Sequence, residues 1–210
     1  MSARLPPRPA AALAGIILAA GNSSRMGTPK ALLQFEGETF LDRLIGIFGR
    51  VCRHTIVVLG HHAESIQLKL ARQAAFVRNP DPDRGQLTSL QCGLRAVPAG
   101  MDGVMFTPLD YPAIETETVE RLVESFSGSR AAIALAIPRC QHRRGHPVVV
   151  RAALIAEFLA LPETASARDV VRRHDAAIRY VEVRDTGILT DVDTPEDYRR
   201  LLERKGLARP

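Results

Sequence analysis

The sequence predicts one α/β domain built around a mostly parallel central sheet. Short apolar runs alternate with amphipathic helical segments along the chain, a pattern that is typical of β-α units. No internal repeat or linker divides the 210 residues, and 46% of them are hydrophobic, which is enough for a large core. The longest apolar run covers residues 10–21 and is shorter than the ~20 residues that a membrane-spanning helix needs.

The first strand is expected at residues 13–20, directly after a proline-rich start. We expect residues 1–12 to form a flexible extension and residues 13–206 to form the domain. Arg4 and Arg8 precede the apolar run, so the start of the chain also resembles a secretory signal. Cleavage behind that run would destroy the glycine-rich loop that follows it, which argues against a signal.

The later elements follow the same alternation. Thr39 suits the N-cap of the first helix, and Thr194 precedes the last helix with Asp197 at the capping-box position. The other predicted strands are residues 54–59, 75–77, 103–106, 131–137, 148–150 and 178–183. The predicted helices are residues 39–51, 62–73, 88–97, 116–127, 152–161, 167–174 and 195–204.

The net charge indicates the kind of ligand that the protein binds, and the cysteines indicate the compartment in which it works. The chain has 28 Lys and Arg against 23 Asp and Glu, a net charge of +5, which favours an anionic partner. It has no tryptophan, 5% aromatic residues and scattered arginines, so we expect a small phosphorylated ligand rather than nucleic acid. Cys52, Cys92 and Cys140 lie far apart, without disulfide or zinc spacing, and predict buried, reduced thiols in a cytoplasmic protein.

The loop after the first strand carries the strongest chemical signal. Residues 21–27 read GNSSRMG and are followed by Pro29 and Lys30. Backbone N–H groups, two serine hydroxyls, the Arg25 guanidinium and the Lys30 ammonium together suit a polyphosphate. The spacing matches neither the GxxxxGK[ST] phosphate loop nor the GxGxxG dinucleotide loop. The alternative is a glycine-rich turn without a ligand, which the two basic side chains disfavour.

Residues 18–30, which read LAAGNSSRMGTPK, resemble the signature of the MobA-like nucleotidyltransferases, in particular the molybdenum cofactor cytidylyltransferases. Four later segments are similar to further motifs of this family and follow in the family's order: residues 79–90, 109–112, 145–147 and 191–195. One such motif would be weak support, whereas five in order are strong. The resemblance spans about residues 14–200 and implies a three-layer Rossmann-like fold of the GT-A type.

The resemblance implies the reaction as well. A Mg²⁺-dependent (or Mn²⁺-dependent) enzyme of this kind moves CMP from CTP to a phosphorylated small molecule, here expected to be molybdopterin or molybdenum cofactor, and releases pyrophosphate. A molybdoenzyme that receives the product is the expected partner, and neither nucleic acid nor a membrane is expected. Two alternatives stay open. One is a nucleotidyltransferase for another acceptor, such as a sugar phosphate, with CTP or GTP; the other is a noncatalytic maturation factor for a molybdoenzyme.

The resemblance assigns a set of nucleotide-binding residues, of which Arg25 and Lys30 would meet the phosphates. Ala20 favours CTP over GTP, because the cytidylyl branch has Ala-Gly where the guanylyl branch has Gly-Gly, and a methyl group would crowd a purine. Arg84 could instead be a solvated loop charge and Ser89 an early polar position of a helix. The full expected set is Ala19, Ala20, Gly21, Asn22, Ser23, Ser24, Arg25, Gly27, Lys30, Asn79, Arg84, Gly85 and Ser89.

Three carboxylates are candidates for the metal. Asp110 follows an apolar strand and so lies at the carboxyl edge of the sheet, where its oxygens suit magnesium. We expect it to complete the catalytic set with Arg25 and Lys30. Asp191 and Asp193 are two residues apart, so both project to the same side of an extended segment. One of them is expected to share the metal, although Asp193 also precedes the last helix and in the alternative only orders it.

The acceptor side is expected at Tyr111, Gly145, His146 and Pro147, again from the resemblance. Tyr111 stands where the family often has methionine, next to the expected acceptor. Residues 142–144 read HRR, and they either grip the phosphate of the acceptor or form a solvated charged face.

Overall fold

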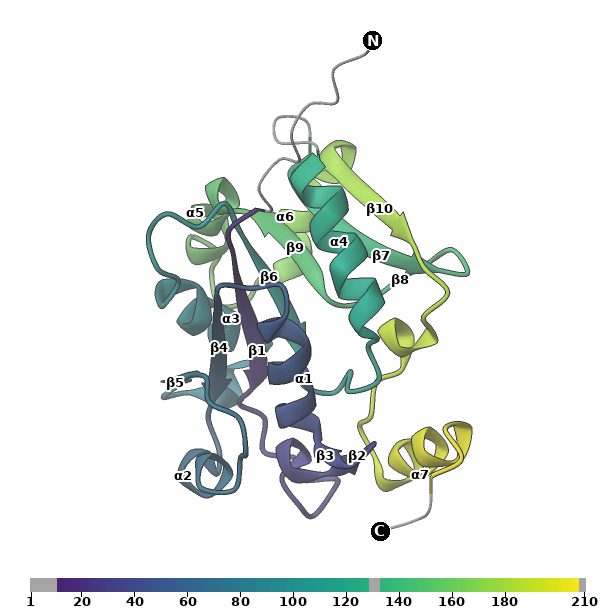
Figure 1. Cartoon of the computed structure of the whole chain (residues 1–210). Helices are drawn as coiled ribbons and strands as arrows, with labels where there is room; N and C mark the ends of the chain where they lie inside the picture. Colours follow the sequence, from purple (N-terminus) through teal and green to yellow (C-terminus); the bar gives the residue numbers. More distant parts are fainter. Residues whose placement is uncertain (1–10, 129–132, 208–210) are drawn as a thin grey trace.

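A central mixed sheet with helices on both faces organises the chain (Figure 1). The structure is a computed structural model that describes residues 11–128 and 133–207. In these residues the sheet has eight strands, in the order β10-β7-β9-β6-β1-β4-β5 with β8 paired to β7. The strands are β1 (Leu13–Ala19), β4 (His54–Leu59), β5 (Ala75–Arg78), β6 (Gly103–Pro108), β7 (Leu135–Cys140), β8 (Arg143–Arg144), β9 (Val148–Arg151) and β10 (Ile178–Glu182).

Most neighbouring strands run parallel. β1 lies between β4 and β6 and is parallel to both, and the pairs β4–β5 and β7–β10 are parallel too. β9 runs antiparallel to its neighbours β6 and β7. The mostly parallel sheet predicted from the alternation of strands and helices is therefore confirmed.

The helices form two outer layers. α1 and α4 pack on one face of the sheet, and α3, α5 and α6 pack on the other (Figure 1). This three-layer arrangement is the one that the family resemblance implied. The helix bounds are α1 (Phe40–Gly49), α2 (Ala63–Gln67), α3 (Gln86–Arg95), α4 (Thr116–Gly128), α5 (Ile155–Leu159), α6 (Ala167–Arg173) and α7 (Pro195–Arg204).

Alternating side chains of β1 supply both cores. Ile17 belongs to the apolar core under α1, whereas Ile16 and Leu18 belong to the core under α3. Successive strand residues point to opposite faces, so a fully apolar strand buried on both sides is required here. α1 packs so closely that position 15 must be glycine, since a Cβ there would lie 2.5 Å from the Phe48 ring.

The helix predicted over residues 62–73 is wrong in its second half, because α2 ends at Gln67. The backbone N–H groups of Ala71 and Arg72 donate to the Asp42 carboxylate of α1, at 3.0 and 2.8 Å. Asp42 is only 4% exposed, so it needs such partners. The chain leaves the helical path at this point to supply them.

Other differences are smaller. A hairpin of β2 (Gln34–Phe35) and β3 (Glu38–Thr39), turning through two residues with positive φ, was not predicted. Of the strand expected at residues 131–137, residues 131–132 lie outside the described part, and β7 starts at Leu135.

Residues 11 and 12 directly precede the start that we expect for the domain. Residues 1–10 of the expected extension lie outside the described residues. Ala11 and Ala12 are buried, and the Ala12 N–H donates to Asp102 Oδ2 at 2.8 Å. These two residues of the expected extension are therefore packed against the described fold.

The cysteines are free thiols, with Cys52 and Cys140 buried and Cys92 half-buried. Burial raises the pKa of the Cys52 thiol to about 12, so this group stays protonated and inert. Among the helices of the described residues, none combines the length and the apolar character needed to cross a membrane.

Candidate active site

The carboxyl ends of β1 and β6 meet at one edge of the sheet. Leu18 pairs with Pro108, and beyond the paired stretch the Leu109 N–H donates to the Leu18 carbonyl at 3.0 Å. The loop after β1 and Asp110, which follows β6, are thereby held side by side. Open α/β sheets bind their ligands at this edge.

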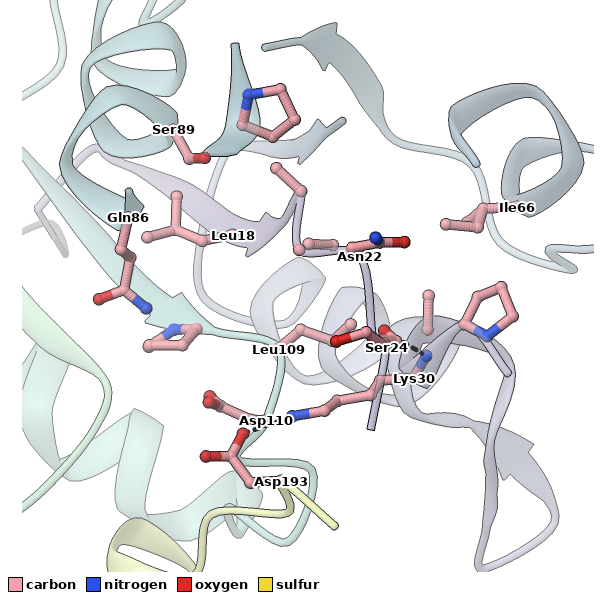
Figure 2. Close-up of a pocket in the computed structure, with 18 of the residues that line it drawn as sticks. Leu18, Asn22, Ser24, Lys30, Ile66, Gln86, Ser89, Leu109, Asp110 and Asp193 are labelled. Carbon is pink, nitrogen blue, oxygen red and sulfur yellow. Dashed lines mark hydrogen bonds and ion pairs between the residues drawn. The ribbon is translucent and has the colours of Figure 1, made fainter. Parts of the chain in front are cut away.

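A cavity of about 340 Å³ opens there (Figure 2). One end holds the charged side chains of Lys30, Asp110 and Asp193, whereas Gln86 and Ser89 lie towards the other end (Figure 2). We call these the charged end and the far end of the cavity. The predicted nucleotide residues that line it are Ala19, Ala20, Gly21, Asn22, Ser23, Ser24, Arg25, Lys30, Gly85 and Ser89.

The residues predicted to bind the nucleotide and the residues that line the cavity are not the same set. Gly27, Asn79 and Arg84 were expected around the nucleotide but are not part of the cavity wall. Gln86 was missed although it directly follows the predicted Gly85, and Ile66 of α2 was missed because no motif marks it. The lining residues without a prediction are Leu18, Pro29, Ala31, Ile66, Pro82, Gln86, Pro108 and Leu109.

Ser23 shapes the glycine-rich loop. Its φ of 54° lies in the left-handed region, and its carbonyl accepts a hydrogen bond from the Met26 N–H at 2.9 Å. Its hydroxyl accepts from the Lys30 N–H at 3.0 Å. The serine thus ties the start of the loop to its end and fixes the backbone from which the Lys30 side chain enters the cavity.

Two basic side chains converge on one carboxylate at the charged end. Lys30 Nζ lies 2.5 Å from Asp193 Oδ1, and Arg25 Nη1 lies 3.7 Å from Asp193 Oδ2. The Lys30 side chain is 14% exposed and that of Arg25 is 67% exposed. Solvent screens the Arg25 contact, so Lys30 is the stronger partner of Asp193.

Asp110 lies beside this pair, and one of its two carboxylate oxygens has no partner in the described part of the chain. Its Oδ1 atom is buried and accepts no hydrogen bond from the described residues. Burial raises the pKa of Asp110 to about 6, Lys30 lowers it in part, and the nearby Asp193 and Asp191 raise it further. A buried carboxylate oxygen left unpaired beside a second carboxylate suits a divalent cation.

Asp193 reaches the cavity because α7 is capped just behind it. Thr194 and Asp197 form the predicted capping box, and Asp197 Oδ2 also accepts from the Asp193 N–H at 3.2 Å. The segment is anchored to the other strand end by the Val192 N–H, which donates to the Asp110 carbonyl at 2.8 Å. Asp191 is exposed and does not line the cavity. Asp193 therefore does more than order the start of α7, because its side chain lines the charged end of the cavity.

The two carboxylates cannot form a complete cation site alone. The described residues contain no group of three or more His, Cys, Asp or Glu side chains arranged to hold a metal ion. A Mg²⁺ ion held by Asp110 and Asp193 would take its remaining oxygens from water and from phosphates, the arrangement in which magnesium usually binds to nucleotide enzymes.

The second loop is organised by Asn79, which is 2% exposed. Its Nδ2 donates to Thr88 Oγ1 and to Ser89 Oγ, both at 3.0 Å. Its Oδ1 accepts from the Asp81 N–H at 3.0 Å. Asn79 therefore acts behind the cavity wall, while Ser89 of α3 lies in the wall itself.

A second cavity of about 270 Å³ adjoins the first. The two share four lining residues: Leu18, Gly85, Gln86 and Pro108. Arg84 lines the second cavity and forms ion pairs with Glu163 and, at 3.9 Å, with Asp81. Glu163 was not predicted, because it lies between helices in a stretch without a motif.

His146 brings the predicted acceptor loop to the second cavity. Its ring lies 4.7 Å from that of Tyr111, and its buried Nδ1 has no hydrogen-bond partner among the described residues. Burial, with a smaller contribution from Arg168, lowers the pKa of His146 to about 4. Burial and the nearby Asp110 raise the pKa of Tyr111 to about 12. Both rings are thus neutral near pH 7.

The other residues predicted for the acceptor loop are occupied with packing inside the fold. A Cβ at Gly145 would lie 2.3 Å from the Ile188 carbonyl oxygen, so glycine is needed for close packing. Arg144 lies over the Tyr180 ring and 3.6 Å from Asp175, away from both cavity walls. Pro147 is buried. The structure therefore brings His146, and not the 142–144 segment, to the second cavity.

The sequence profile of the MobA-like NTP transferase domain matches residues 15–178. The chain belongs to the MobA-like NTP transferase family. The predicted recognition is confirmed, and this member of the family is a nucleotidyltransferase. Asp193 lies beyond the matched segment.

Individual relatives agree on the family and differ in name. The MobA-like chain is 31% identical over 193 residues to the molybdenum cofactor cytidylyltransferase of Escherichia coli (strain K12), covering 90% of this chain and 95% of the relative. It is also 31% identical over 200 residues, with the same two coverages, to the nicotine blue oxidoreductase of Paenarthrobacter nicotinovorans.

A solved structure supports the fold. A nucleotidyl transferase from Methanothermobacter thermautotroptrophicus superposes with a TM-score of 0.76 at 24% identity, covering 92% of this MobA-like chain and 97% of that one. The Rossmann-like fold class implied by the resemblance is confirmed.

Proposed function

We propose that this protein transfers CMP from CTP to a phosphorylated small-molecule acceptor, with a molybdopterin-type cofactor as the leading acceptor, and releases pyrophosphate. The observation that carries the proposal is the charged end of the cavity. There the unpartnered Asp110 oxygen lies beside the Lys30–Asp193 pair. Carboxylates for a cation and basic groups for phosphates, side by side, suit a metal-bound triphosphate and no neutral ligand.

The chain's own groups would divide the work at this end. Asp110 and Asp193 are the residues that would hold Mg²⁺, which when bound supplies positive charge against the phosphates. Lys30 and Arg25 would meet phosphate oxygens, Lys30 as a compact charge and Arg25 with its planar guanidinium. An oxygen of the acceptor phosphate forms the new bond to the α-phosphorus, and the electron pair of the broken bond leaves with pyrophosphate.

In this proposal the base lies at the far end of the cavity, and the loop beside it favours a pyrimidine. Ala20 lines the cavity and is buried, so its methyl group limits the space beside the loop. A purine needs more room there than cytosine does. The name of the cytidylyltransferase relative is in line with this choice.

We place the acceptor in the second cavity. Because the two cavities share part of their walls, a molecule in the second one faces a nucleotide in the first. His146 lies in its wall and comes from the loop predicted for the acceptor. Holding two reactants in contact in this way is the main contribution that a protein makes to phosphoryl transfer.

Pyrophosphate release with each of the four nucleoside triphosphates and Mg²⁺, with and without a molybdopterin-type acceptor, tests the proposal. We expect release with CTP and only when the acceptor is present. Release with CTP and a sugar phosphate instead would replace the acceptor and leave the nucleotide assignment intact. The absence of release with every nucleotide and acceptor, in protein that binds CTP, would favour a noncatalytic maturation factor.

The oxidoreductase relative defines one more control. If the chain shared that protein's named activity, it would consume a redox partner and show no dependence on nucleoside triphosphates. Measuring absorbance changes of NADH and NADPH in the same reactions separates the two activities. We expect no change, because the charged end carries a phosphate and cation set.

A further inference from the structure

The wall of the second cavity carries an ion pair between Arg84 and Glu163. We propose that Arg84 is an anion-binding residue of this cavity, and that the Glu163 carboxylate takes the place of a phosphate group on Arg84 until a phosphorylated ligand displaces it. The inference rests on the proposed function, because it names the residue that a phosphate group of the acceptor contacts in the second cavity.

Among the described residues that line the second cavity, only Arg84 and Glu163 are charged near pH 7. His146 is neutral there, because burial lowers its pKa to about 4. The planar guanidinium of Arg84 is built to bind oxyanions through paired N–H groups. In the structure Glu163 supplies that oxyanion, whereas the Asp81 carboxylate lies further away, at 3.9 Å.

The backbone of Arg84 is held in a tight turn. Residues Pro82–Arg84 form a 3₁₀ turn that begins with a proline, and the Arg84 N–H donates to the Asp81 carbonyl at 3.2 Å. Gly85, which follows directly, lines both cavities. The turn therefore presents Arg84 beside the part of the wall that the two cavities share.

Glu163 lies between two anchored points of the segment that joins α5 to α6. Before it, Nε2 of the buried Gln91 in α3 donates to the Phe158 and Leu161 carbonyls, at 3.0 and 3.1 Å. After it, the capping box of α6 fixes the chain. The Glu163 side chain itself is 57% exposed, so its carboxylate can turn from Arg84 into water by rotation of the side chain alone.

The ion pair is weak enough to be exchanged. The Arg84 side chain is 49% exposed, close to the value for Glu163, and water screens the attraction between two such groups. A phosphate group offers the guanidinium the same paired oxygens as a carboxylate and carries more negative charge. Phosphate is therefore the stronger partner of Arg84, and Glu163 is the one that gives way.

Binding of inorganic phosphate to the whole chain, measured by equilibrium dialysis, tests the inference. The first cavity is filled beforehand with Mg²⁺ and α,β-methylene-CTP, which cannot transfer its nucleotide. Glu163→Gln removes the competing carboxylate and should bind phosphate about three- to tenfold more tightly than the unmodified protein. Arg84→Met removes the cation and should bind phosphate on the order of tenfold less tightly.

The double variant Arg84→Met/Glu163→Gln tests whether the two residues act on the same anion. Without the guanidinium there is no phosphate for Glu163 to exclude, so the gain from Glu163→Gln should disappear. Glu157→Gln is the matched control. Glu157 pairs with Arg173 and His174 of the neighbouring segment and lies outside both cavity walls, so its replacement changes the net charge equally and should leave phosphate binding unchanged.

The outcomes separate this inference from the proposed function. Unchanged phosphate binding in Glu163→Gln or in Arg84→Met, or an equal gain in Glu157→Gln, overturns the inference and leaves the nucleotide site in place. Loss of the bound phosphate when the nucleotide analogue enters also overturns it, because the anion then lies in the first cavity. Failure of the analogue to bind overturns the proposed function, and the comparison of Glu163→Gln with Glu157→Gln without nucleotide still decides the role of Arg84.

Discussion

Asp110 is held where its charge is unfavourable. Its pKa is raised to about 6 by burial, and the nearest groups include two further carboxylates as well as Lys30. An unfolded aspartate has a pKa of about 3.8–3.9. The folded chain therefore binds a proton more readily than the unfolded chain between pH 4 and 6, and its stability falls as the pH rises through that interval.

Asp110→Asn removes this penalty together with the charge that would hold a cation. We expect most activity to disappear, while the metal-free variant becomes more stable than the unmodified protein at pH 8 by up to ~2–3 kcal/mol. At pH 4 the two proteins should unfold alike. Urea unfolding in EDTA at both pH values measures the difference. Equal stability at pH 8 or near-normal turnover would contradict the role given to Asp110.

Lys30 and Arg25 differ in exposure, so their replacement should differ in effect. Lys30→Ala is expected to lower kcat/KM for CTP on the order of 10²-fold or more. Arg25→Ala should lower it by about tenfold, because the exposed guanidinium is screened by water. Arg95→Ala, at the far end of α3, removes a surface charge elsewhere and is the control. If both site variants kept normal kinetics, the glycine-rich loop would have a structural role alone.

Ala20→Gly tests the room beside the loop. One methyl group in a pocket is worth ~1–3 kcal/mol, so the ratio of kcat/KM for CTP to that for GTP should fall by about tenfold. The change should come mainly from better use of GTP. A GTP preference already present in the unmodified protein would show that the methyl group does not set the base.

At the scale of elements, the cap of α7 is coupled to the charged end. Thr194→Ala removes an N-cap worth about 1 kcal/mol and loosens the segment that carries Asp193. We expect a several-fold higher KM for Mg²⁺ in addition to the loss of stability. Thr39→Ala removes the equivalent cap of α1, which lies outside the cavity wall, and should reduce stability alone. Identical KM values for Mg²⁺ in the two variants would contradict the coupling.

Local signals explain which elements could be predicted from the sequence. The caps of α1 and α7 depend on residues three positions apart, and both were predicted. The true end of α2 depends on Asp42, a buried carboxylate of another helix, which no local pattern reveals. Short-range motifs succeed where the decisive partner is a near neighbour in the chain.

The same distinction between near and distant partners separates the site residues that could be predicted from those that could not. The loop after β1 and Asp110 lie within continuous motifs, and the structure brings them to one cavity. Arg84 was expected at the nucleotide, but Glu163 from a distant segment holds it at the second cavity. The unpaired oxygen of Asp110 could not be predicted either, because it depends on what the folded chain fails to place beside it.

On the scale of the whole molecule, loops from β1, β5 and β6 and the segment before α7 enclose the cavity. A ligand that contacts all of them stabilises the fold as a unit. At a hundred times its Kd, CTP with Mg²⁺ should add about 2.7 kcal/mol, which raises the Tm of a chain of this size by roughly 5–10 °C. Thermal unfolding with CTP, in Mg²⁺ and then in EDTA, measures the effect. A shift that persists in EDTA would argue against a cation between the carboxylates and the phosphates.

Lys30 and Asp193 are 163 positions apart in the chain, although their side chains touch. A ribosome releases the glycine-rich loop first, then Asp110, and the segment before α7 only after that. A growing chain therefore carries Lys30 without its carboxylate neighbour while the residues between them are added. The charged end of the cavity is completed only when α7 docks, so this corner cannot assemble before the whole of the sheet has been synthesised.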